Sequence, residues 1–137
     1  MSVVLDTGIV VALMFPDDEN HAAAVGLLDD VAEDLVTTPL ALAEMDHLTL
    51  ARVGRHAQEA LWNDLDRGVF AIRWWADGLR DMLEVARSRP DIGLVDASLV
   101  ALAARLHTVR IATFDHRHFR TLVNEDGRPF TLLPADG

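Results

Sequence analysis

At 137 residues, half of them hydrophobic, the chain is long enough for one domain over residues 1–137 with a buried core, and no apolar run is long enough to cross a membrane. It has no cysteine, which excludes disulfide bonds, thiolate zinc sites and cysteine nucleophiles and fits a reducing compartment. The formal net charge is −10, which argues against non-specific nucleic-acid binding unless arginines gather locally or bound cations reverse the charge of an acidic site.

Strands and helices are predicted to alternate along the first half of the chain. The expected elements are a strand over Ser2–Asp6, a helix over Gly8–Phe15, a helix over His21–Leu35, a strand over Val36–Thr38 and a helix from Pro39 to about Val53. Thr38 is a typical N-cap residue, and Pro39 suits the first position of the helix that follows it.

The second half continues the alternation. The expected elements are a helix over Arg55–Arg67, a strand over Val69–Trp74, a helix over Trp75–Arg89, an apolar helix within Asp91–His107, a strand over Val109–Phe114, a helical turn over His116–Arg120 and a strand over Phe130–Leu133. Short buried strands between helices predict an α/β fold, namely a three-layer α/β/α sandwich around a mainly parallel sheet. In such sheets, a functional site lies beyond the carboxyl ends of the strands.

Four carboxylates occupy positions where an acid is unexpected. Asp6 and Asp115 close two apolar strands, whereas Glu44 and Asp96 lie within apolar stretches of predicted helices. An unpaired buried carboxylate costs several kcal/mol, and the chain has no lysine to pair with any of them. Taken singly, Asp6 and Asp115 could be helix caps and Glu44 could face solvent. Taken together, with two of them at strand ends, the four acids predict a shared site.

Divalent metal catalysis is the chemistry that uses such a set of acids. Mg²⁺ and Mn²⁺ prefer oxygen ligands, usually carboxylates together with water and substrate phosphate. Several carboxylates close together repel one another and raise their pKa values, and a bound cation removes that cost. The cation also brings a phosphate into a pocket that would otherwise exclude it, which answers the objection from net charge at the site itself.

The order and spacing of these acids resemble the PIN-domain family, and more narrowly the VapC toxins of bacterial toxin–antitoxin pairs. The matching segments are Asp6-Thr7, Pro39 to Glu44, Gly93-Leu94-Val95-Asp96-Ala97 and the run from Thr113 to Phe119. Each segment alone is a weak signal, but the four in this order are specific. The resemblance extends from Val3 to Leu133.

The resemblance implies a cytoplasmic Mg²⁺- or Mn²⁺-dependent endoribonuclease that is usually a homodimer and is silenced by a small VapB-like antitoxin. The residues that it assigns as metal-site carboxylates are Asp6, Glu44, Asp96 and Asp115. It makes Thr113 a hydroxyl that orients the site, and Thr7 a candidate for a similar role. Gly8 departs from the pattern, because many relatives have a polar residue there. This departure puts one hydrogen bond of the site in doubt.

Arg117 follows the last acid closely and has the geometry to contact a phosphate near the scissile bond. The alternative is that it pairs with Asp115 or Asp91, and Asp91 itself is a candidate N-cap for the helix that follows it. A histidine of this segment as metal ligand or general acid is the weaker expectation. Trp62, Trp74 and Trp75 are expected to pack in a core or partner groove more than to stack on bases.

Other α/β classes fit the sequence poorly. Receiver domains and haloacid-dehalogenase-like phosphatases need a lysine, and dinucleotide-binding modules need a glycine-rich turn that the chain lacks. Two alternatives remain open. One is a non-catalytic PIN-like binding protein with a structural metal site, and the other is a structure-specific DNA nuclease on the same scaffold.

Overall fold

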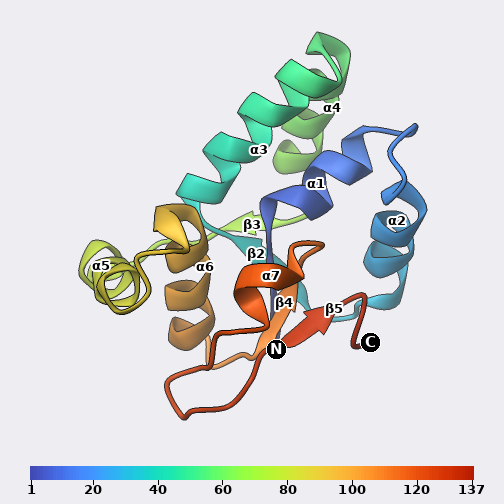
Figure 1. Cartoon of the computed structure of the whole chain (residues 1–137). Helices are drawn as coiled ribbons and strands as arrows, with labels where there is room; N and C mark the ends of the chain where they lie inside the picture. Colours follow the sequence, from blue (N-terminus) through green and yellow to red (C-terminus); the bar gives the residue numbers. More distant parts are fainter.

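A parallel sheet of five strands forms the centre of the molecule, in a computed structural model that describes residues 1–137 (Figure 1). The strands are β1 (Ser2–Leu5), β2 (Asp34–Thr37), β3 (Ala71–Ile72), β4 (Arg110–Ala112) and β5 (Thr131–Leu133). They lie in the order β3-β2-β1-β4-β5, and every neighbouring pair is parallel. β1 is therefore central, and its residues Val3, Val4 and Leu5 are fully buried.

Seven helices cover the sheet. They are α1 (Thr7–Met14), α2 (His21–Asp30), α3 (Pro39–Arg52), α4 (Arg55–Asp66), α5 (Gly78–Ser88), α6 (Gly93–Arg105) and α7 (His116–Phe119). Because crossovers between parallel strands are right-handed, the strand order places α1 to α4 on one face of the sheet and α5 to α7 on the other. Figure 1 shows α5 and α6 across the sheet from α1 and α2. The predicted α/β sandwich with a parallel sheet is confirmed.

The direction of chain winding changes between β1 and β4. From β1 the chain proceeds to β2 and β3 on one side, and it then returns to β4 and β5 on the other side. The crossovers that leave β1 and β4 therefore depart to opposite faces and open a crevice at the carboxyl ends of these two strands. Asp6 and Asp115 follow these strand ends closely, so the topology positions both acids at the crevice.

The start of α3 follows the local sequence as expected, whereas the start of α6 does not. The Thr38 hydroxyl accepts a hydrogen bond from the amide of Ala41 at 3.2 Å, with Pro39 in the first turn of α3. α6 begins at Gly93, whose φ of +80° lies in the left-handed region that favours glycine. The N-cap of α6 is Ile92, which offers no side-chain bond. The interpretation of Asp91 as that cap was wrong, because its carboxylate is held by Arg89 at 2.8 and 2.9 Å.

Several predicted boundaries were wrong. The helix predicted to extend to Leu35 ends at Asp30, because Asp34 and Leu35 pair with β1 and the sheet outcompetes the helical pattern. The strand predicted over Val69–Trp74 is reduced to the two residues of β3, which lies at the sheet edge. No helix combines the length and apolarity needed to span a bilayer.

Candidate metal centre

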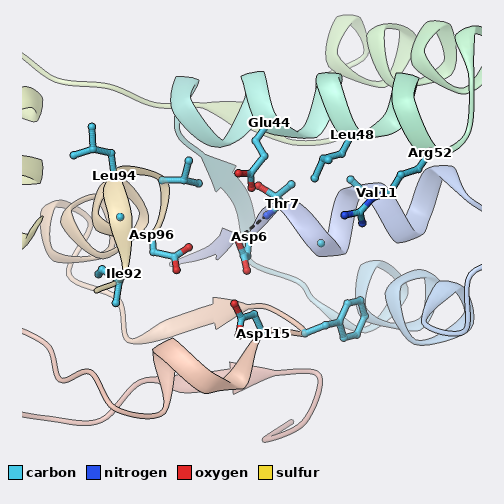
Figure 2. Close-up of a pocket in the computed structure, with 14 residues that line it drawn as sticks. Asp6, Thr7, Val11, Glu44, Leu48, Arg52, Ile92, Leu94, Asp96 and Asp115 are labelled. Carbon is cyan, nitrogen blue, oxygen red and sulfur yellow. Dashed lines mark hydrogen bonds between the residues drawn. The ribbon is translucent and has the colours of Figure 1, made fainter. Parts of the chain in front are cut away.

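The crevice at the carboxyl ends of β1 and β4 is a cleft of about 750 Å³. Four acids line it, one each from the end of β1, from α3, from α6 and from the end of β4, namely Asp6, Glu44, Asp96 and Asp115. Figure 2 shows the carboxylates of all four directed into the same space. Residues that are far apart in the sequence thus converge at one place, as the predicted shared site requires.

Asp6 is the most buried of the four acids, with 7% of its surface exposed. One carboxylate oxygen accepts a hydrogen bond from the Thr7 amide at 2.8 Å, and the other accepts one from the Thr113 hydroxyl at 2.7 Å. Burial, and after it the charges of Asp96 and Asp115, raise the pKa of Asp6 to about 6 against the opposing effect of these hydrogen bonds. Asp6 is both the cap of α1 and a member of the acidic cluster, so its local and shared roles are not exclusive.

Asp96 and Asp115 approach each other across the cleft, with His118 between them. The Nδ1 atom of His118 lies 2.8 Å from Asp96 Oδ2 and 3.9 Å from Asp115 Oδ2, and one ligand atom from each of the three lies within 4.8 Å of the others. Burial raises the pKa of Asp96, as do the charges of Asp115 and Glu44, although the His118 contact opposes this. Asp115 also accepts a hydrogen bond from the Arg117 amide and thereby caps α7.

Thr113 connects the ends of the two central strands. Its side chain is fully buried, and besides donating to Asp6 its hydroxyl accepts a hydrogen bond from the Asp115 amide at 2.9 Å. Thr113 therefore fixes the position of Asp6 relative to the chain that carries Asp115. Thr7 also lines the cleft, and its buried Oγ1 has no hydrogen-bond partner.

The donor set fits a divalent cation. The groups facing the cleft are mostly hard oxygen ligands, and burial together with their mutual repulsion raises the pKa values of Asp6 and Asp96. The unpartnered hydroxyl of Thr7 leaves a buried oxygen with free bonding capacity. A cation would relieve the repulsion and would compensate for the burial of Asp6. Gly8 lines the cleft without a side chain, so the hydrogen bond that a polar residue would give there is absent.

Two residues of the cleft region were missed by the sequence analysis or given too little weight. His118 touches both Asp96 and Asp115, whereas a role for a histidine was the weaker expectation. Arg52 lines the cleft from the last turn of α3, and nothing in its local sequence distinguishes it from other helix-terminal arginines. Only the eight-residue spacing from Glu44 along one helix would have signalled that both face the same cleft.

Arg117 and the tryptophans do not line the cleft. The Arg117 guanidinium is exposed and pairs with neither Asp115 nor Asp91, so its assignment to a phosphate stays a prediction. Trp75 packs against the core and donates to Asp81 at 2.9 Å. Trp62 and Trp74 are each 38% exposed.

The PIN domain family matches residues 3–123 of the chain, which contain all four acids of the cleft. Ribonuclease VapC26 of Mycobacterium tuberculosis is 33% identical over 135 residues, and the match covers 96% of this chain and the whole of that protein. The predicted resemblance is therefore confirmed over nearly the full length.

Solved structures share the fold. The crystal structure of VapC20 from Mycobacterium tuberculosis, a Sarcin-Ricin loop cleaving toxin, superposes with a TM-score of 0.74 at 23% identity and covers 84% of this chain and 91% of its own. VapBC2 from Rickettsia felis, bound to a DNA fragment from their promoter, gives a TM-score of 0.67 at 16% identity over 96% of this chain and 98% of its own.

Proposed function

The chain belongs to the PIN-domain family and is an endoribonuclease of the VapC type, and from this premise we propose that it cleaves RNA with one or more Mg²⁺ or Mn²⁺ ions held by Asp6, Glu44, Asp96 and Asp115. The observation that carries the proposal is the convergence of these acids from four elements on one cleft at the switch point of the sheet. Divalent metal dependence is general in the family, and the choice of ion is the finer part of the proposal.

A divalent ion at this place would supply a Lewis acid that lowers the pKa of a bound water and neutralises charge on the leaving oxygen. The chain's own residues position that chemistry. Burial and the neighbouring acids disfavour the charged forms of Asp6 and Asp96, and a bound cation would stabilise those charged forms and so promote loss of their protons. Thr113 holds Asp6 through its hydroxyl, and His118 holds Asp96 through Nδ1.

We further propose a small VapB-like antitoxin as the partner, a homodimer as the assembly and the cytoplasm as the location. The similar structure from Rickettsia felis is a VapBC2 complex, and the full-length match to ribonuclease VapC26 supports the same class. A protein that cuts RNA in the cell that makes it needs such an inhibitor. A small upstream reading frame that encodes a DNA-binding protein with a flexible tail would support the pairing.

The test is RNA cleavage by purified, antitoxin-free protein with Mg²⁺ or Mn²⁺, with EDTA, and in the variants Asp6→Asn and Asp96→Asn. We expect EDTA to abolish cleavage and each variant to lose on the order of 100-fold or more in rate and to bind Mn²⁺ more weakly in calorimetry. The matched control is Asp66→Asn, because Asp66 is an exposed carboxylate outside the cleft and should leave both readouts unchanged.

Each open alternative predicts a different result. Wild-type protein that binds Mn²⁺ but cuts no RNA would favour the non-catalytic binding protein. Metal-dependent cleavage of structured DNA in place of RNA would favour the DNA nuclease. Cleavage that survives both Asp6→Asn and Asp96→Asn would show that the activity resides elsewhere or in a contaminant.

A further inference from the structure

The cleft is negatively charged at one end and positively charged at another place along its length. The acids gather at the strand ends, and the only cationic residue among those lining the cleft is Arg52. This guanidinium takes part in no ion pair in the structure, whereas five of the other eleven arginines pair with acids. Arg52 therefore places an unpaired positive charge on the wall of a cleft whose other charged residues are all acidic.

Helix geometry sets the distance of Arg52 from the acids. Glu44, Leu48 and Arg52 follow one another at four-residue intervals on α3, and all three line the cleft, so they share one face of the helix. A rise of 1.5 Å per residue separates Glu44 from Arg52 by about 12 Å along the helix axis. Figure 2 shows the Arg52 side chain extending from α3 toward α1, with its guanidinium beside Val11 and directed back toward the acid end of the cleft.

Apolar surface fills the interval between the acids and Arg52. Leu48 from α3 and Val11 from α1 line this part of the cleft, and they present no hydrogen-bonding group to a ligand. A ribose or an unstacked base can cover such a surface, whereas a lone small anion would leave it exposed to water. Along the cleft, the acids, the apolar surface and the cation thus follow one another in an order that fits an RNA strand lying lengthwise in it.

We propose that Arg52 binds a phosphate of the RNA strand about one to three nucleotides from the scissile bond. The proposal rests on the ribonuclease function given above. The interval of about 12 Å corresponds to roughly three nucleotides of a stacked strand at 3.4 Å each, and to fewer when the strand is extended. A guanidinium suits this contact because it can donate two parallel hydrogen bonds to a phosphate.

A purely structural role for Arg52 makes different predictions. Arg52 lies in the last turn of α3, where a cation stabilises the negative end of the helix dipole. Loss of that effect alone would lower the free energy of unfolding and would leave the salt dependence of RNA binding as it was.

The first test measures RNA binding in a cleavage-blocked background. An unpaired oligoribonucleotide is titrated into Asp96→Asn protein and into the same protein with Arg52→Gln, Arg52→Lys or Arg87→Gln. We expect Arg52→Gln to weaken binding roughly tenfold and to reduce the slope of log Kd against log salt by about 0.7, the value for one lost phosphate contact to a single strand. Arg52→Lys should keep the slope and lose part of the affinity.

Arg87 on α5 provides the matched control, because it is an exposed arginine that is absent from the cleft and from the ion pairs. Arg87→Gln should change neither affinity nor slope. An Arg52→Gln protein with an unchanged slope, or the same slope change in Arg87→Gln, would overturn the proposal. Thermal unfolding of each variant reports any effect on the helix separately.

The second test locates the contact on the RNA. Oligonucleotides that carry one neutral methylphosphonate linkage at successive positions are cleaved by otherwise wild-type protein and by Arg52→Gln. We expect one flanking position at which the neutral linkage slows the wild-type protein roughly tenfold but does not further slow Arg52→Gln. Sensitivity that is the same in both proteins at every position overturns the proposal. Wild-type protein that cuts none of the RNAs would count against the ribonuclease function instead.

Discussion

At the scale of single residues, Asp6 shows how one carboxylate serves the fold and the site together. Its two oxygens accept hydrogen bonds from the start of α1 and from Thr113, yet burial still raises its pKa to about 6. The hydrogen bonds stabilise the charged form, and burial and the neighbouring acids destabilise it. Of the two hydrogen bonds, the one from the Thr113 hydroxyl lowers the pKa of Asp6 more, so removing this hydroxyl should raise that pKa.

Thr113→Val should raise the pKa of Asp6 further. A hydrogen bond to a charged group contributes about 1.5 kcal/mol or more, so the pH at which Mn²⁺ binding reaches half of its maximum should move up by about one unit. Calorimetric titration of Mn²⁺ between pH 5 and pH 8 measures this shift. Thr113→Ser, which keeps the hydroxyl, is the control and should leave the midpoint in place. An unchanged midpoint in Thr113→Val would mean that the hydroxyl does not hold Asp6 in its charged form.

At the scale of elements, a buried pair of hydroxyls joins the start of α3 to the second turn of α6. The Thr38 Oγ1 and Ser98 Oγ atoms are 2.8 Å apart, and both residues are fully buried. Thr38 also caps α3, which carries Glu44, while α6 carries Asp96. One hydroxyl therefore fixes a helix start and aligns two helices that supply acids to the cleft.

Thr38→Ala should lower the free energy of unfolding by about 1–3 kcal/mol, because it removes the cap and one of the two hydrogen bonds of the Ser98 hydroxyl, which keeps only its bond to the Val95 carbonyl. Denaturant unfolding of the metal-free protein measures the loss. Thr38→Ser retains both bonds and should stay within about 0.5 kcal/mol of wild type. A loss of the same size in Thr38→Ser would attribute the effect to the buried methyl group and not to the hydroxyl.

The sequence predicted elements well where a local signal marks their ends, and poorly where tertiary contacts decide. Thr38 and Pro39 give the start of α3 correctly, because capping is local. The end of α2 was missed because pairing of Asp34 with β1 is a long-range contact. The start of α5 was placed too early, because the helical pattern does not mark Gly78 as the first residue. The side chain of Trp74 packs so close to Gly78 that a Cβ there would lie 2.5 Å from it, a contact that the pattern does not reveal.

At the scale of the whole molecule, the sequence predicted the convergence of the acids because topology alone brings strand ends together. Asp6 and Asp115 end strands that lie side by side at the switch point, so their proximity follows from a parallel sheet. The positions of His118 and Arg52 depend on the orientation of α7 and on how α3 packs over α1, and residue spacing in the sequence does not predict helix packing. The positions missed in the site are thus the ones set by helix packing.

The acidic cluster also makes the stability of the whole molecule depend on pH and metal. The pKa of Asp6 is raised from 3.8 to about 6, so its contribution is fully present below pH 3.8 and is lost as pH rises through 6, a loss of about 3 kcal/mol. The raised pKa of Asp96 acts in the same direction. Asp91 and Asp136, with pKa values of about 2, act in the opposite direction, but only at lower pH.

Metal-free protein should therefore become less stable between pH 4 and pH 6.5, and a divalent ion should reverse this at pH 7.5. An ion at 100 times its Kd adds about 2.7 kcal/mol, which corresponds to a rise of roughly 10 °C in Tm for a chain of this size. Thermal unfolding with Mn²⁺ and with EDTA across this pH range measures both effects. Asp6→Asn removes the charge that causes the decline, so its stability should fall less with pH and should gain little from Mn²⁺. If the wild-type protein gained stability between pH 4 and pH 6.5 without metal, the carboxylates would be compensated by the fold itself, and the cleft would have no need of a cation.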